Sequence, residues 1–353
     1  MMDFFGVKDT AYWLAYEDYV MRFPPGGGND ARFFFLWRTV PCVVIGRNQI
    51  AEAEVDVEEA RRGGVPIVRR SSGGGAVYQD PGSVQYTLIQ PYAAGADEDF
   101  MGVARNQAAE AIARVLKRFG VPAVVEGRND ITANGAKISG ISQFLRGGWL
   151  NTHGTLLYDT DLERLGELLI PDAGKFESKA VKSVRSRVAN IRPIILERLP
   201  HEKPEHGLDS PDTVGGFMRA LDALARKDAE AAGKPYFIIN PDADGLNDIQ
   251  RMRKEKYANP ANTFDKSPPY TYRNAQRFPQ GKVEFFADIK DGTVLSCAVK
   301  GDFIGALPVD NIEEKLCGCP FRPADFDGVL GERIVRRCLG GISKEEFLKM
   351  IFN

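Results

Sequence analysis

The chain has 353 residues, of which 43% are hydrophobic and 27% charged, a composition typical of a soluble globular protein with room for two domains. Its 46 lysines and arginines nearly balance its 48 aspartates and glutamates, and a net charge of −2 argues against nucleic acid or an anionic membrane as a partner. The first residues lack the basic and apolar regions of a signal peptide, and no apolar run is long enough to span a membrane. We therefore expect a cytoplasmic protein.

The cysteines and histidines give no sign of a disulfide framework or a metal centre. Five cysteines, an odd number without a signal peptide, indicate thiols rather than disulfides. Cys317 and Cys319 lie too close together, with no histidine nearby, to indicate a zinc site. The chain has three histidines, too few for a histidine-based centre.

Hydrophobic periodicity in the first 240 residues predicts helices and strands in mixed order, rather than the strict alternation of a parallel α/β sheet. The expected helices cover 11–23, 55–62, 101–119, 161–169 and 213–231. The expected strands cover 33–37, 40–45 and 84–89, with shorter strands carrying 129–130, 137–140 and 153–155. We predict an α+β fold built on a large mixed sheet.

The composition changes near residue 240, since 240–245 and 259–269 are rich in asparagine, aspartate and proline. Beyond them, Asp291 and Gly292 between two apolar runs predict a hairpin. Further helices are expected at 311–317, 332–338 and 343–352. We expect a large domain over 1–248, a linker over 249–262 and a small α+β accessory domain over 263–353.

Residues 69–80 (RRSSGGGAVYQD) form the most informative segment. Three consecutive glycines leave the backbone unshielded by Cβ atoms, so its N–H groups can approach an anion closely. Strand-like residues flank the loop at 65–68 and 76–78, whereas a P-loop or a dinucleotide site places a helix after its glycines. Neither of those two motifs occurs in the chain. A plain glycine turn with solvated arginines is the alternative interpretation.

Four further blocks accompany this segment: GRNDI at 127–131, KISG at 137–140, HGTLL at 153–157 and SVRSRV at 183–188. In this order, the five blocks resemble the lipoate–protein ligase A family of the biotin/lipoate ligase superfamily, and weaker similarity reaches both ends of the chain. The resemblance implies a catalytic domain of that superfamily followed by the family's C-terminal accessory domain. It also implies activation of (R)-lipoate by ATP to lipoyl-AMP, and transfer of the lipoyl group to a lysine of a lipoyl-carrier domain.

Lys137 is the candidate catalytic residue. Joining a carboxylate to the α-phosphate of ATP brings two anions together, so charge on the transferring phosphoryl group must be neutralised. The lysine at this position of the family contacts both the acyl carboxyl oxygen and the phosphate. Ser139 and Gly140 beside it are small and leave room for a ligand. A solvated surface lysine is the alternative.

The resemblance implies roles for further residues of these blocks. The expected ATP-binding residues are Arg70, Gly75, Ala76, Val77, Tyr78, Asn129 and Lys137. The expected lipoate-binding residues are Ser72, Gly73, Gly74, Lys137, His153 and Gly154. Asp130 is the candidate ligand of Mg²⁺, which prefers oxygen ligands and phosphate partners, and a turn-stabilising role is its alternative.

Four of the polar residues leave more than one role open. We expect His153 to position backbone rather than to shuttle protons. Arg69 points away from Arg70 if both lie on a strand, which suits a structural ion pair. Arg185 and Arg187 alternate and share a face, where phosphate, an acceptor domain or ion pairs within the fold are equally suitable partners.

Two positions depart from the family pattern. Gln79 stands where the family usually has histidine, and Ser83 where it usually has asparagine. Gln79 donates and accepts hydrogen bonds but carries no charge, so we expect a lipoyl pocket of altered shape.

The implied cofactors are ATP and magnesium. The implied partners are apo lipoyl domains of 2-oxoacid dehydrogenase E2 subunits, the glycine cleavage H protein, or both, and we expect a monomer. One rival is an octanoyl or lipoyl transferase, which forms a thioester on cysteine without ATP. No cysteine falls between residues 43 and 296, which argues against that rival. A non-catalytic protein that binds lipoyl-adenylate is the other, and a biotin ligase would carry a different glycine–arginine loop.

Overall fold

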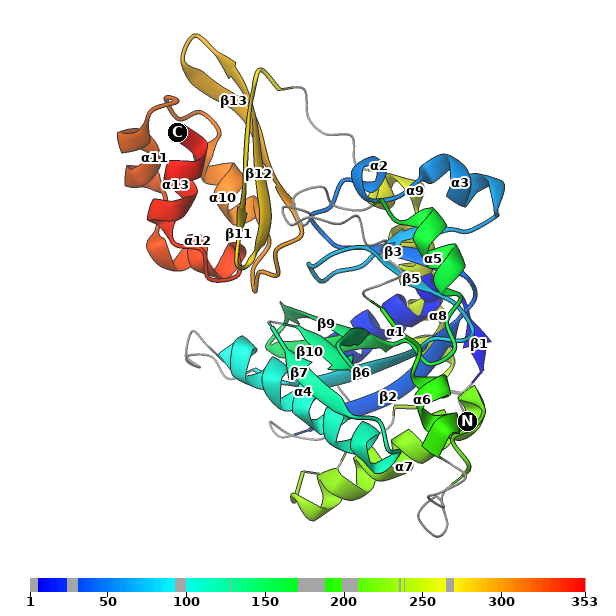
Figure 1. Cartoon of the computed structure of the whole chain (residues 1–353). Coiled ribbons are helices and arrows are strands. Elements are labelled where there is room, and N and C mark those ends of the chain that lie inside the picture. Colours follow the sequence, from blue (N-terminus) through cyan, green and yellow to red (C-terminus); the bar gives the residue numbers. More distant parts are fainter. Residues whose placement is uncertain are drawn as a thin grey trace.

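The computed structural model describes residues 6–23, 31–92, 100–127, 129–170, 188–198, 209–234, 236–237, 239–264 and 270–352 (Figure 1). These residues form a large body and a smaller C-terminal unit, each with its own hydrophobic core. Both units combine sheets with helices, which confirms the predicted α+β fold.

A seven-stranded mixed sheet forms the centre of the large body. Only β1 runs parallel to its neighbour, β2, and the other neighbouring strands pair antiparallel. In spatial order the strands are β1 (Val7–Lys8), β2 (Phe33–Thr39), β6 (Val84–Pro91), β10 (Trp149–Leu156), β9 (Ala136–Arg146), β8 (Asp130–Ala133) and β7 (Ala123–Glu126).

Helices cover both faces of this sheet. Because successive strand residues point to opposite faces, Phe34 and Leu36 of β2 pack under one helix layer, and Phe33, Phe35 and Trp37 under the other. The first layer contains α4 (Phe100–Arg118), α6 (Ile191–Arg198) and α7 (Val214–Ala231). The second contains α1 (Thr10–Arg22), α8 (Ala243–Met252) and the π-helical turn η4 (Arg253–Tyr257). Among the described helices, none combines the length and apolar character needed to cross a membrane.

A second, three-stranded sheet carries the glycine segment. β3 (Cys42–Ile45) lies between β4 (Ile67–Arg69) and β5 (Val77–Gln79), so the strands expected on both sides of the glycines are confirmed. Three short helices pack against this sheet: α2 (Ala51–Glu54), α3 (Val57–Arg62) and α5 (Leu162–Leu168).

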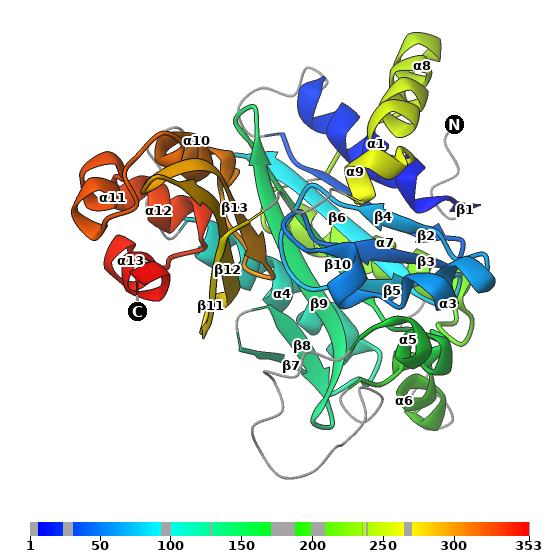
Figure 2. The ribbon, with the colours of Figure 1, turned by 90° about the horizontal axis from the view of Figure 1, so that it is seen from above.

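The C-terminal unit places a three-stranded antiparallel sheet toward the large body and its helices on the outer side (Figures 1 and 2). Asp291 adopts a φ of 51° in the predicted hairpin. The strands are β11 (Tyr272–Phe278), β12 (Gly281–Lys290) and β13 (Thr293–Gly301). The helices are α10 (Asp310–Leu316), α11 (Pro323–Val329), α12 (Glu332–Cys338) and α13 (Lys344–Phe352).

The stretch 249–262, expected to be a linker, belongs instead to the large body. It contains the end of α8, η4 and most of α9 (Pro260–Thr263), and Ile249, Met252 and Tyr257 are buried in the core beneath α1. The polar surface of these helices resembles a linker in composition, but their apolar residues recur at helical spacing. We propose that the boundary between the two units lies between residues 264 and 270.

Candidate active site

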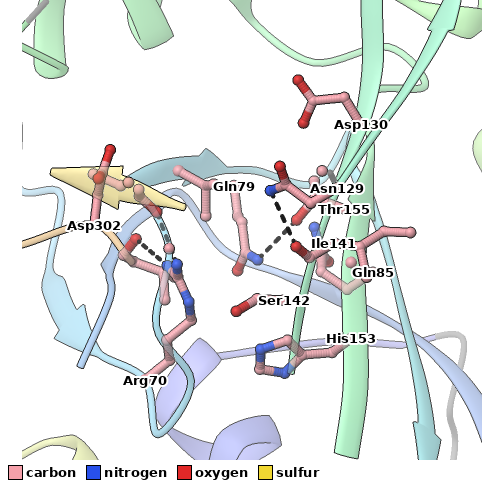
Figure 3. A pocket seen from close by; sticks show the side chains of 18 of the residues that line it. Arg70, Gln79, Gln85, Asn129, Asp130, Ile141, Ser142, His153, Thr155 and Asp302 are labelled. Atoms are coloured by element: carbon pink, nitrogen blue, oxygen red, sulfur yellow. Dashed lines mark hydrogen bonds between the residues drawn. The ribbon is translucent and has the colours of Figure 1, made fainter. Parts of the chain in front are cut away.

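A cavity of about 350 Å³ lies where the glycine segment, the large sheet and the C-terminal unit meet. Figure 3 shows Asp302 of the C-terminal unit on one wall, across from His153 and Thr155 of β10. The residues from the family-like blocks that line it are Arg70, Gly74, Gly75, Ala76, Val77, Gln79, Asn129, Asp130, Lys137, Gly140, His153, Gly154 and Thr155. Blocks far apart in sequence therefore share one cavity.

A β-bulge turns Lys137 toward this cavity. Ile131 of β8 pairs with Ser139 of β9, whereas Thr132 pairs with Lys137, so Ile138 is one extra residue. Without the bulge, alternation would place Lys137 and Gly140 on opposite faces, because they are three residues apart. With it, Ile138 and Ser139 both face the core and Lys137 shares the cavity face with Gly140. The Ala189 N–H donates to the Lys137 carbonyl at 3.0 Å and fixes the bulge from the other side.

Asp130 holds the ammonium group of Lys137. The Lys137 Nζ lies 2.7 Å from Asp130 Oδ1, and both side chains are about one-third exposed to the cavity. A Cβ atom on Gly140 would lie 3.1 Å from both Nζ and Cε of Lys137. Gly140 thus leaves room for the lysine side chain itself, which refines the expectation that it leaves room for a ligand.

Arg70 is buried and holds the glycine loop in shape. Its guanidinium donates to the carbonyl oxygens of Gly73 at 2.6 Å, Gly75 at 2.8 Å and Val44 at 3.1 Å. Burial, reinforced by the charge of Arg69, lowers the pKa of Arg70 to about 10, so it still carries its charge at neutral pH. Arg70 therefore supplies positive charge to the cavity wall while its donors fix the loop.

Arg69 points the other way, as alternation predicts, but it binds carbonyl oxygens. Its guanidinium donates to the carbonyls of Gly46 at 3.0 Å, Asn262 at 2.8 Å and Thr263 at 2.5 Å. Arg69 thereby ties the glycine segment to α9, the last helix before the C-terminal unit.

The C-terminal unit contacts the glycine loop directly. The N–H of Gly74 donates to the carbonyl of Phe303 at 3.3 Å, and a Cβ atom on Gly73 would collide with that same carbonyl. Gly74 has a φ of 88°, which favours glycine. Gly73 therefore lies beneath the contact with Phe303, outside the cavity lining where it was expected to bind lipoate.

His153 is held at both ring nitrogens. Its Nε2 lies 2.7 Å from Ser72 Oγ, and its Nδ1 lies 3.0 and 3.1 Å from the two carboxylate oxygens of Glu17. This order of serine, histidine and acid is that of a hydrolytic triad. Ser72, however, is fully buried and does not line the cavity, and its oxygen already accepts from Arg70 Nε at 3.0 Å. The arrangement holds the His153 ring in place through two side chains, and it does not indicate a nucleophilic serine.

The inner end of the cavity combines apolar and amide side chains. Leu14, Trp37, Val44 and Val77 supply apolar surface that suits an acyl chain. Gln79 donates to Thr155 Oγ1 at 3.2 Å, so the residue that departs from the family pattern is a hydrogen-bonded part of this wall. Ser83, the second departure, lies in a buried turn with Asp80.

Several lining residues had no motif to predict them. Leu14 and Trp37 come from α1 and β2, and the C-terminal unit supplies Arg277, Phe278 and Asp302. Glu17 and Asp18, which lie behind the cavity, do have a sequence signal: they are two consecutive acids in a helix whose other charged residue is Arg22 at its end. Both are buried, and buried acids are rare unless a partner holds them.

The remaining predicted positions divide into two groups. Tyr78 lies on β5, but its side chain packs in the core under α5 because alternation turns it away from Val77 and Gln79. Arg185 and Arg187 lie outside the described residues.

The thiols lie away from the cavity. All five cysteines are described, and none of them lines it. Cys42 is fully buried on β3, and burial raises the pKa of its thiol to about 12. A buried thiol with so high a pKa is a poor nucleophile.

A metal ion is held by several side chains that converge on it. Within the described part of the chain, no group of three His, Cys, Asp or Glu side chains is placed to hold a metal ion. Among the described residues, Asp130 is the acid that pairs with Lys137, so a metal ion here would need most of its ligands from elsewhere.

Fold and cavity together define a catalytic unit of the biotin/lipoate ligase type followed by an accessory unit. A family model described as the lipoyl protein ligase A/B catalytic domain matches residues 9–206, and one described as the bacterial lipoate protein ligase C-terminus matches 267–351. A Bacillus subtilis protein named lipoate-protein ligase LplJ is 30% identical over 352 residues, covering 98% of each chain. The chain belongs to the lipoate–protein ligase family.

Solved structures share the fold. The P. falciparum protein LipL1 in complex with lipoate has a TM-score of 0.71 at 20% identity and covers 97% of this chain and 96% of its own. A lipoate-protein ligase A bound with ATP has a TM-score of 0.57 at 22% identity, covering 73% and 95%. A bipartite Thermoplasma acidophilum lipoate protein ligase, described with its E2 lipoyl domain, has a TM-score of 0.57 at 25% identity, covering 75% and 95%.

Proposed function

We propose that this chain activates lipoate with ATP and transfers the lipoyl group to a lysine of a lipoyl domain. The observation that carries the proposal is the placement of Lys137, whose ammonium group lies in a cavity walled by the glycine loop and an apolar inner end. Family membership and the relatives described with lipoate, with ATP and with an E2 lipoyl domain support it.

In the first step, a lipoate carboxylate oxygen attacks the α-phosphorus of ATP and pyrophosphate leaves, which forms the mixed anhydride lipoyl-AMP. Lys137 neutralises the charge that builds on the transferring phosphoryl group, and Asp130 holds the ammonium until the anions arrive. The acyl chain lies against Leu14, Trp37 and Val44. Asp130 would be the protein ligand of a magnesium ion bound to the ATP phosphates, and that ion would add positive charge at the phosphates.

In the second step, the neutral ε-amine of the acceptor lysine attacks the acyl carbon. The bond to AMP breaks as the amide forms, and the amine loses a proton. The acceptors in this proposal are lipoyl domains of 2-oxoacid dehydrogenase E2 subunits or the glycine cleavage H protein. The described cysteines give no support to the rival transferase, because none of them reaches the cavity.

The test is an assay of the full chain with ATP, magnesium, lipoate and a purified apo lipoyl domain, followed by intact mass. We expect a mass increase of one lipoyl amide that requires both ATP and lipoate. A lipoyl domain with its acceptor lysine changed to arginine is the matched control and should stay unmodified. Modification without ATP, or no modification of any lipoyl domain, would contradict the proposal.

A further inference from the structure

A chain of buried hydrogen bonds connects α1 to the glycine loop. Glu17, in the middle of α1, is only 1% exposed, and its carboxylate accepts from Thr87 Oγ1 at 2.6 Å and faces His153 Nδ1 at 3.0 Å. His153 Nε2 meets Ser72 Oγ at 2.7 Å, and Ser72 Oγ meets Arg70 Nε at 3.0 Å. Arg70 then donates to the loop carbonyls described above. The chain thus runs from the acid to the backbone of the glycines.

With a neutral imidazole ring at His153, one direction of donation satisfies every group of this chain. An ionised carboxylate can only accept, so the hydrogen of the neutral His153 ring lies on Nδ1. His153 Nε2 is then an acceptor and takes the hydroxyl hydrogen of Ser72. The oxygen of Ser72 is left to accept from Arg70, which has no acceptor group of its own. Each residue therefore fixes the orientation of the next.

We propose that Glu17 is a positioning residue for the glycine loop and acts through His153, Ser72 and Arg70. It touches neither the cavity nor a reacting atom, because it does not line the cavity. The negative charge of Glu17 also favours the charged form of the buried Arg70. Burial and the positive charge of Arg69 act in the opposite direction. This inference rests on the proposed function in one respect, namely that the loop holds the adenylate during activation.

The neighbouring acid anchors the neighbouring serine in the same way. Asp18 lies 3.0 Å from Lys256 Nζ, which donates to Ser71 Oγ at 2.8 Å. Lys256 belongs to the π-helical turn η4, a rare geometry often found at functional sites. Two consecutive acids of α1 thus hold two consecutive serines of the segment through two basic side chains.

The kinetic test replaces Glu17 in the full chain and measures lipoate-dependent exchange of pyrophosphate into ATP. Glu17→Met keeps an unbranched side chain but removes the acceptor, and we expect kcat to fall on the order of 10- to 100-fold, the range seen when residues behind metal ligands are removed. The KM for lipoate should change little, because other residues line the acyl end. Glu17→Gln, whose amide oxygen still accepts from His153 Nδ1, should recover part of kcat.

Glu284→Gln is the matched control. Glu284 is also a buried acid, but it pairs with Arg273 and Lys282 in the C-terminal unit and does not line the cavity. It should leave kcat unchanged. A folded Glu17→Met protein, shown by thermal melting, that keeps the wild-type kcat would overturn the inference.

Nitrogen NMR of the ligand-free protein tests the anchor independently of activity. In the wild-type protein, His153 should show a protonated Nδ1 and an unprotonated Nε2, and a His153→Gln variant assigns the signals. The Glu17→Met change should mix the two tautomers. A wild-type His153 protonated at Nε2, or a tautomer indifferent to Glu17, would overturn the inference. If the protein formed no lipoyl-AMP at all, only the proposed function would fail, and this measurement would still decide the role of Glu17.

Discussion

Lys137 reaches the cavity because one extra residue, Ile138, interrupts the pairing of β8 with β9. The bulge places Lys137 beside Gly140 and Asp130, with the ammonium 2.7 Å from the carboxylate. A cation fixed by backbone geometry and a single ion pair costs little reorganisation when an anionic transition state forms. We therefore expect Lys137 and the nearby Gly140 to govern the rate of activation.

Lys137→Ala should reduce lipoyl-AMP synthesis by about 10²- to 10³-fold, the loss found when one preorganised donor of a transition-state charge is removed. The fold should persist, because about one-third of the side chain is exposed and it contributes no core packing. Chromatography of the adenylate product measures the effect, with Lys290→Ala on the exposed hairpin as control. Near-normal synthesis by Lys137→Ala would remove the lysine from the mechanism.

Gly140→Ala should lower the same rate on the order of 10- to 100-fold, because a small misplacement of a catalytic group is costly. The new Cβ would lie 3.1 Å from Nζ and Cε of Lys137 and displace the ammonium. Gly331→Ala, where a Cβ meets open space, is the matched control. Equal activity of the two variants would show that a Cβ atom at position 140 does not displace the Lys137 ammonium group.

At the scale of elements, α1 carries both buried acids and part of the cavity wall. Glu17 contacts His153 of β10, and the adjacent Asp18 pairs with Lys256 of η4. Burial works to raise the pKa of Asp18, but the charges and hydrogen bonds of Lys256 and Arg146 outweigh it and leave that pKa below its ordinary value. Asp18 therefore stabilises the fold at neutral pH.

This lowered pKa predicts the acid dependence of stability. The contribution of Asp18 is complete above the unfolded-state pKa of about 3.9, and it is lost as the pH falls through the lower folded-state value. At pH 7, Asp18→Asn should lower the free energy of unfolding by roughly 2–3 kcal/mol. This loss is smaller than that for a fully buried ion pair, because the cationic partners of Asp18 are about one-third exposed. The denaturation midpoint of this variant should then vary less with pH below 4.

Denaturant unfolding from pH 2 to pH 7 measures the effect. Asp327→Asn is the control, because it removes the ion pair of an exposed carboxylate with Lys344 and should leave the curve unchanged. Parallel curves for the wild type and Asp18→Asn would show that folding does not lower the pKa of this carboxylate.

Most helices and strands of the large body could be predicted from the sequence, since local periodicity determines them. The helices at 11–23, 101–119 and 213–231 correspond to α1, α4 and α7. The motif residues of the cavity were predictable for a different reason, namely the family resemblance. The helices α8, η4 and α9 were not predicted, because their polar composition resembles that of a linker. Leu14, Trp37 and Glu17 could not be assigned to the site. The cavity that Leu14 and Trp37 line, and the contact of Glu17 with His153 of β10, form only when distant segments pack.

At the scale of the whole molecule, the C-terminal unit completes the cavity. Arg277, Phe278, Pro279, Gly281 and Asp302 form one wall, and the Phe303 carbonyl binds the N–H of Gly74. Activation requires water to be kept from the mixed anhydride, whereas transfer must admit a whole protein domain. The two steps therefore place different demands on this wall.

A truncated chain ending at Phe264 should lose lipoyl-AMP synthesis but still transfer the lipoyl group from supplied lipoyl-AMP. This end point keeps the carbonyls of Asn262 and Thr263, which accept from Arg69. Separate assays of the two steps measure the effect, with thermal melting to confirm that the truncated protein is folded. A truncated protein that activates lipoate at the full rate would show that the wall is dispensable.

The most direct test of the central claim is exchange of labelled pyrophosphate into ATP by the full chain. Exchange reports reversible formation of the acyl-adenylate at the cavity that holds Lys137, and it needs no acceptor domain. We predict exchange that starts only when lipoate is added and that falls about 10²- to 10³-fold in the Lys137→Ala variant. Absence of exchange, together with a hydroxylamine-sensitive acyl group on a cysteine of the chain, would contradict this prediction.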